Sequence, residues 1–102
     1  MKNRNLSQAN LRGANLDRAN LRGADLRGTN LKGASLKGAN LNRVDLAGAY
    51  LKNTDLNEAD LREANLDRVN LTEANMKNIR NLDSAIKCKT IFSWGEDNSG
   101  CE

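Results

Sequence analysis

The chain has 102 residues with one Trp, one Tyr and one Phe, which suits a single domain whose core is built from small and aliphatic side chains. A formal net charge of only +3 argues against a dedicated nucleic-acid binder. No apolar run reaches the roughly 18 residues of a membrane span, and residues 1–10 lack the apolar segment of a secretory signal, so we expect a soluble, cytoplasmic protein.

A five-residue repeat begins close to the N-terminus. Leu is the central residue of fourteen consecutive repeats from Leu6 to Leu71, and Met76 is central in the next one. Two positions before each centre, from Ala9 to Ile79, lies a small or branched residue. A period of five fits neither a helix nor a long strand, because residues five apart share no face in either element. The pattern therefore predicts short extended segments with a turn in every repeat, and with these two columns pointing inward.

Four such repeats would close a square turn of twenty residues. Glycine, as in Gly13 and Gly23, often stands two positions after the centre, where a type II turn requires a positive φ. Other side chains resist that conformation. We therefore predict type I or irregular corners where this position carries Arg18, Arg43, Glu58, Glu63, Arg68 or Glu73.

The repeated pattern A(N/D)LxG, as in ANLRG at residues 9–13, resembles the pentapeptide-repeat family. The resemblance covers residues 4–78 and implies an all-β fold, a right-handed quadrilateral parallel β-helix of about four coils. We assign the β-helix to residues 1–81. Its predicted structural core is the central column, namely Leu6, Leu11, Leu16, Leu21, Leu26, Leu31, Leu36, Leu41, Leu46, Leu51, Leu56, Leu61, Leu66, Leu71 and Met76.

The repeat decays in residues 82–102, which we predict to form a C-terminal cap. Asn81 stands where a central Leu is expected, although Ile86 and Ile91 fall on the central count. A terminal coil needs a cover for its strand edges and its Leu column, and Phe92 and Trp94 are the predicted lids.

Both cysteines lie in this tail, which resembles the short Cys-bearing tails of some cyanobacterial pentapeptide-repeat proteins. Cys88 and Cys101 are thirteen positions apart, and they either form a disulfide that closes the cap or remain reduced. A reducing cytoplasm favours the thiols, whereas the weakness of the cap favours the crosslink. We predict the disulfide in oxidised, purified protein.

Stacking by twenty residues places three cations in one outward column, Arg12, Lys32 and Lys52, with Tyr50 nearby. This column is interpreted either as a site for an anion or a partner, or as an ordinary solvated face. Residues 1–50 carry a net charge of +6 and residues 51–102 carry −3, which is interpreted either as surface variation between repeats or as a basis for oriented or head-to-tail association. Only residues 1–3 precede the first repeat, so we also predict self-association through the N-terminal coil.

Catalysis has little support in the sequence. The chain has no His, no nucleophile elbow and no phosphate-binding loop, and no enzyme activity or cofactor is predicted. The acidic residues of a dense run fall on two sides of a square coil, so we predict no metal site at Asp55, Glu58, Asp60 and Glu63.

We predict a non-catalytic structural or binding scaffold with a protein partner. The alternative is binding of an anion or nucleic acid through the Arg12, Lys32 and Lys52 column. The resemblance implies a third function, DNA mimicry, since some family members linked to quinolone resistance inhibit topoisomerases as acidic rods. This chain departs from that pattern because it is short and basic.

Overall fold

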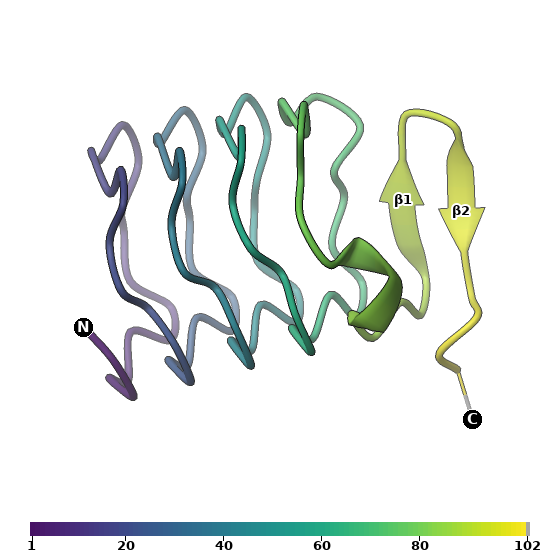
Figure 1. The fold of residues 1–102 in the computed structure, drawn as a ribbon, viewed down its shortest axis with the longest axis horizontal. Coiled ribbons are helices and arrows are strands. Elements are labelled where there is room, and N and C mark those ends of the chain that lie inside the picture. The colour runs from purple at the N-terminus through teal and green to yellow at the C-terminus, as the bar shows by residue number, and fades with distance from the viewer. Residues whose placement is uncertain (102) are drawn as a thin grey trace.

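The computed structural model describes residues 1–101 and forms a four-sided coil whose turns stack from the N-terminus to the C-terminus (Figure 1). Parallel β-bridges join residues twenty apart, from Asn5 with Asp25 to Asp60 with Arg80. Longer elements occur only near the C-terminus, as the 3-10 helix η1 (Leu82–Ser84) and the strands β1 (Thr90–Phe92) and β2 (Gly95–Asp97). The predicted right-handed quadrilateral parallel β-helix is confirmed. No helix in the described part of the chain is long and apolar enough to cross a membrane.

The bridging residues define four faces, which we name by one member each, and four coils, residues 5–24, 25–44, 45–64 and 65–85. In chain order the Asp25 face carries Asn5, Asp25, Asp45, Asn65 and Ile86, and the Tyr50 face carries Asn10, Asn30, Tyr50, Asn70 and Ile91. The remaining bridging residues are Asn15, Ser35, Asp55 and Asn75 on the Asp55 face and Asn20, Asn40, Asp60 and Arg80 on the Asp60 face.

The interior is filled by the central leucines. Every central Leu from Leu21 to Leu71 is at most 1% exposed, because each packs against the inward side chains of neighbouring coils. The members nearest the two ends, including Leu6 and Met76, are only partly buried, since one neighbouring coil is missing there. In the second inward column, Thr29 donates its buried hydroxyl to Leu6 O at 2.8 Å.

Enlarging the second inward column should destabilise the fold. Ala39 is fully buried, so an Ala39→Leu substitution has no space for its added methyl groups and should lower the free energy of unfolding by about 1–3 kcal/mol. Thermal melts would measure this loss. Ala47→Leu is the matched control, because Ala47 lies outward on a corner and is only partly covered. A melt of Ala39→Leu that equals wild type would contradict the inward assignment.

The prediction of type I or irregular corners is wrong at five of the six positions for which it was made. The backbone φ lies between 56° and 63° at Arg18, Arg43, Glu58, Glu63 and Arg68. The next coil holds these corners through their N–H groups, as when Arg18 N donates to Lys37 O at 2.7 Å. Glu73 does not adopt a positive φ, and its N–H has no such acceptor among residues 1–101. Stacking between coils therefore overrides the preference of the individual residue.

The fourth coil contains one extra residue, which Asn81 (φ 60°) and η1 accommodate. Beyond it, Asn65 bridges Ile86 and Asn70 bridges Ile91, so the spacing becomes 21 residues. The prediction that Ile86 and Ile91 are central is therefore wrong, because both lie on outer faces, 47% and 36% exposed. Parallel bridging also continues beyond residue 81, where the sequence analysis placed the start of the cap.

Lys87 and Phe92 take the two central positions that follow the extra residue. Phe92 is 2% exposed and stacks on the Trp94 ring with centroids 4.6 Å apart, so the two predicted lids lie together. Lys87 is 9% exposed, and its Nζ donates to Leu82 O at 2.8 Å. A buried ammonium group is tolerated here because it is hydrogen-bonded to the carbonyl groups of Leu82 and Asp83 in η1.

The tail covers two of the four open edges at the C-terminal end. β2 pairs antiparallel with β1 on the Tyr50 face, and Gly100 N donates to Lys87 O at 2.7 Å on the Asp25 face. A disulfide joins Cys88 to Cys101, whose Cα atoms are 4.9 Å apart. At the N-terminal end, four bridging residues have backbone N–H and C=O groups without a backbone partner among residues 1–101, namely Asn5, Asn10, Asn15 and Asn20. Self-association through that edge stays a prediction.

Candidate binding face

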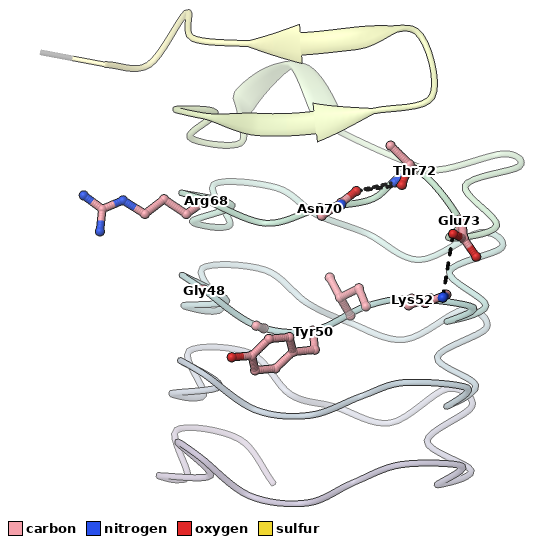
Figure 2. Close-up of a pocket in the computed structure, with 9 residues that line it drawn as sticks. Gly48, Tyr50, Lys52, Arg68, Asn70, Thr72 and Glu73 are labelled. Atoms are coloured by element: carbon pink, nitrogen blue, oxygen red, sulfur yellow. Dashed lines mark hydrogen bonds and ion pairs between the residues drawn. The ribbon is translucent and has the colours of Figure 1, made fainter.

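A groove of about 320 Å³ crosses the Tyr50 face between the third and fourth coils. Its lower wall is formed by residues 48–52 and its upper wall by Arg68, Asn70, Thr72 and Glu73 (Figure 2). The groove ends at the Lys52–Glu73 ion pair, whose charged atoms are 4.0 Å apart. Its volume is at the lower limit of small-molecule sites, so it suits a shallow contact with part of a larger ligand.

The hollow follows from the side chains that surround it. Gly48 has no side chain to fill the corner, and the space where its Cβ would lie is open. Tyr50 is 63% exposed, and its ring is turned towards the Gly48 side of the face (Figure 2). Arg68 extends outward from the corner above, so an aromatic ring and a guanidinium group mark one end of the groove.

The predicted basic column lies along the opposite edge of this face. The bridges between Asn10, Asn30 and Tyr50 put the column in register, so Arg12, Lys32 and Lys52 occupy the same corner of three successive coils. All three side chains are exposed. Of these three cations, only Lys52 has an ion pair within residues 1–101. The column is therefore close to Tyr50, and its remaining charges are not neutralised by described carboxylates.

The asparagines of the Tyr50 face present donors to the solvent. The side-chain Oδ1 of Asn10, Asn30 and Asn70 accepts the backbone N–H two residues later, at 3.3, 3.1 and 3.0 Å respectively. These contacts direct each carbonyl oxygen towards its own turn. Each Nδ2 group has no protein acceptor among residues 1–101. The free polar groups beside the basic column are thus hydrogen-bond donors, which suit an anionic ligand.

Each of the other three faces contains a carboxylate that accepts such an amide. Asn65 Nδ2 donates to Asp45 at 3.3 Å, and Asn75 Nδ2 donates to Asp55 at 3.2 Å. On the Asp60 face, Asn81 Nδ2 donates to Asp60 at 2.7 Å. The Tyr50 face has no Asp at any bridging position, so its asparagine amides and the adjacent basic column face no bridging carboxylate.

Two bridging carboxylates of the other faces, Asp25 and Asp60, have lowered pKa values. The hydrogen bond and charge of Arg27 lower the pKa of Asp25. Partial burial raises the pKa of Asp60, but the hydrogen bonds from Asn81 and from the Arg62 N–H, together with the charges of Arg80 and Arg62, outweigh it and lower the pKa. These groups neutralise cations within the protein and leave little free charge for a ligand.

The lowered pKa of Asp60 predicts a contribution to stability that disappears in acid. Its ordinary value is 3.8 and the folded value is lower, so the contribution is complete above the unfolded pKa and is lost as pH falls through the folded pKa. Asp60→Asn should therefore melt below wild type near neutral pH, and the two proteins should converge well below pH 3.8. Melts across this range measure the difference, and a gap that widens in acid would contradict it.

A second hollow, of about 410 Å³, lies at the corner between the Asp55 and Asp60 faces. Its lining includes both signs of charge, among them Asp17, Lys37 and Glu58. The Ser35 hydroxyl and the Lys37 N–H both donate to Asp17, which lowers the pKa of this carboxyl. Because Asp17 and Lys37 already have partners within the protein, this corner is a weaker candidate than the Tyr50 face.

The acidic run is divided between faces, with Asp55 on one and Asp60 on the next. Within residues 1–101 no group of three His, Cys, Asp or Glu side chains is arranged to hold a metal ion. The upper wall of the groove, including Arg68, Asn70 and Thr72, was not predicted from the sequence. Counting twenty residues on from Tyr50 and Lys52 leads to Asn70 and Thr72, and this was the available signal.

Two solved structures of cyanobacterial proteins are similar to this chain. The pentapeptide-repeat protein Rfr23 from Cyanothece 51142 shares 38% identity with a TM-score of 0.77, and covers 79% of this chain and 54% of its own. The pentapeptide-repeat protein alr5209 from Nostoc Pcc 7120 shares 42% identity with a TM-score of 0.73, covering 74% of this chain and 63% of its own. The chain thus spans between half and two thirds of these relatives.

A plant protein, AT2G44920 from the Arabidopsis thaliana thylakoid lumen, is also similar, with 31% identity and a TM-score of 0.57. It covers 88% of this chain and 66% of its own. No curated protein sequence matches the chain. The family model for pentapeptide repeats matches residues 5–43 and 39–78, which together make up most of the chain. Because this match covers most of the chain, the chain belongs to the pentapeptide-repeat family.

Proposed function

We propose that this chain is a non-catalytic binding scaffold that docks a protein partner on the Tyr50 face. The observation that supports this most directly is the groove beside the exposed Tyr50 ring, with Arg68 at its rim. Tyr and Arg are enriched among the residues that contribute most to protein–protein binding. A rigid coil that holds them in a fixed arrangement loses little conformational freedom on association.

The interior supports a scaffold over an enzyme. The central leucines fill the coil, so the described residues form shallow surface hollows and no deep cleft. Enzyme sites typically enclose a substrate among convergent polar groups. Here the polar groups of different faces point away from one another, and the flat faces are suited to contact with another macromolecule.

The alternative function is binding of a phosphate-rich ligand or nucleic acid through the basic column. The observation in its favour is that Arg12 and Lys32 have no ion pair within residues 1–101. Tyr50 is the single aromatic residue among the bridging residues of this face and offers little base stacking, which single-stranded nucleic acids use. DNA mimicry has less support, since the candidate face is positively charged and a mimic must be acidic.

Site-specific photo-cross-linking tests the proposal. A benzophenone amino acid at position 50 should capture a protein from a lysate of the native cells, and the product should resist nuclease treatment. The same group in place of Asn42, at the corner that follows the Asp60 face, is the control and should not capture that protein. Equal capture from both positions, or capture of nucleic acid alone, would overturn docking of a protein on the Tyr50 face.

A further inference from the structure

The protein itself shows how a carboxylate binds between two coils. Asp55 lies in the third coil, 3.8 Å from Lys37 Nζ of the second coil and 3.2 Å from Asn75 Nδ2 of the fourth. On the Asp25 face, Asp45 lies in the same way between Arg27 Nε, at 3.9 Å, and Asn65 Nδ2, at 3.3 Å. A cation from one side and an amide from the other thus bracket each carboxylate.

The Asp60 face uses the same arrangement with two amides. Asn81 Nδ2 donates to Asp60 at 2.7 Å, and the Asn42 amide, oriented to donate, lies 3.0 Å from Asp60 Oδ1. On three faces, therefore, donors from the coils on either side converge on an Asp of the third coil. Such charge-assisted hydrogen bonds are stronger than neutral ones.

The Tyr50 face has the donors without the carboxylate. Five residues before Lys37 lies Lys32, and five residues before Asn75 lies Asn70, so both donors occupy equivalent positions on the Tyr50 face. Between them the third coil carries Tyr50 in place of Asp. Neither Lys32 Nζ nor Asn70 Nδ2 has a hydrogen-bond or ion-pair partner among residues 1–101.

We propose that the Tyr50 face binds an acidic segment of a partner protein, whose carboxylates take the place that Asp45, Asp55 and Asp60 occupy on the other faces. This inference rests on the proposed function and names the chemistry of the partner. The charge of the face supports it, because Arg12, Lys32 and Arg68 surround the site without described counter-ions. The exposed ring of Tyr50 and the groove above it provide a contact for the backbone of the bound segment.

The experiment uses two fluorescein-labelled decapeptides, one alternating Asp with Ser and the other alternating Asn with Ser. Fluorescence anisotropy should detect binding of the acidic peptide alone, with an affinity that falls as salt is added. Lys32→Glu should weaken binding about tenfold, since it turns an attraction between charges roughly 5 Å apart in water into an equal repulsion. Lys77→Glu, with the same charge change at a corner outside the Tyr50 face, should change it less than about twofold.

Two substitutions at Tyr50 distinguish the effect of an added negative charge from the effect of removing the ring. Tyr50→Asp should install the missing carboxylate between Lys32 and Asn70 and so compete with the peptide, weakening binding at least as much as Lys32→Glu. Tyr50→Asn removes the same ring without adding charge and should bind more tightly than Tyr50→Asp. Far-ultraviolet circular dichroism and thermal melts verify that each variant is folded.

Side-chain amide resonances in ¹⁵N NMR spectra give a residue-specific measurement. On addition of the acidic peptide, the Nδ2 signals of Asn30 and Asn70 should shift, whereas those of Asn65 and Asn75, which already donate to Asp, should stay in place. Equal binding of the two peptides, or equal losses for Lys32→Glu and Lys77→Glu, would overturn the inference. Tighter binding of single-stranded DNA than of an acidic peptide of equal charge would also overturn the inference and would indicate a nucleic-acid ligand.

The two proposals fail separately. If the benzophenone at position 50 captures a protein while the acidic decapeptide does not bind, docking on the Tyr50 face is supported and an acidic partner segment is excluded. If the decapeptide binds as expected but cross-linking captures only nucleic acid, the anion chemistry of the face is supported, and the proposed protein partner is overturned together with its acidic segment.

Discussion

Leu36→Ala is expected to lower the free energy of unfolding by about 2–5 kcal/mol. Leu36 is fully buried in the middle of the central column, so truncation removes apolar contacts and leaves a cavity inside the second coil. The rigid backbone bonds above and below, such as Leu36 N to Asp55 O at 2.7 Å, limit collapse around that cavity. Chemical denaturation monitored by circular dichroism measures the loss.

Leu6→Ala is the matched control for this prediction. Leu6 belongs to the same column but lies at the N-terminal end, where it is only partly buried, so the same truncation should cost less. Equal losses at the two positions would show that burial in the column does not determine the contribution of each leucine. A loss at Leu36 below that at Leu6 would contradict the one-dimensional packing of the coils.

Cys101→Ser is expected to lower the free energy of unfolding by about 3 kcal/mol relative to the oxidised protein. The bond between Cys88 and Cys101 closes a loop that includes β2, and the chain-entropy model assigns this gain to restriction of the unfolded chain. Loss of the bond should also loosen the tail locally. Hydrogen exchange should accelerate at Gly100 N, which donates to Lys87 O, before it changes at Ala39 N in the middle of the coil.

Wild-type protein under reducing conditions is the control, because it lacks the same crosslink without any substitution. Its denaturation midpoint should match that of Cys101→Ser within error. Two free thiols counted in unreduced native protein would show that the disulfide is absent in solution. An unchanged midpoint after verified reduction would show that the tail is held by its hydrogen bonds and by the Phe92–Trp94 stack alone.

The sequence by itself determined the architecture and one edge of the candidate face. A five-residue period with two apolar positions can bury both only if the chain turns in every repeat, so the inward columns and the twenty-residue coil follow from local pattern. Once that period is known, Arg12, Lys32 and Lys52 must lie above one another, and Tyr50 must lie beside them. In a repeat protein, residues that are distant in sequence but adjacent in the fold can be identified by counting repeats.

Only the tertiary structure decided what depends on contacts between coils. Residue preference argued against positive φ at Arg18 and Glu58, yet hydrogen bonds to the next coil impose it. Counting also failed after Asn81, because one extra residue absorbed by η1 moved Phe92 into the core and Ile91 out of it. The missing carboxylate beside Tyr50 is evident only when equivalent positions on the four faces are compared. Whether a side-chain donor has an acceptor depends on which side chains meet across coils, and no single repeat determines this.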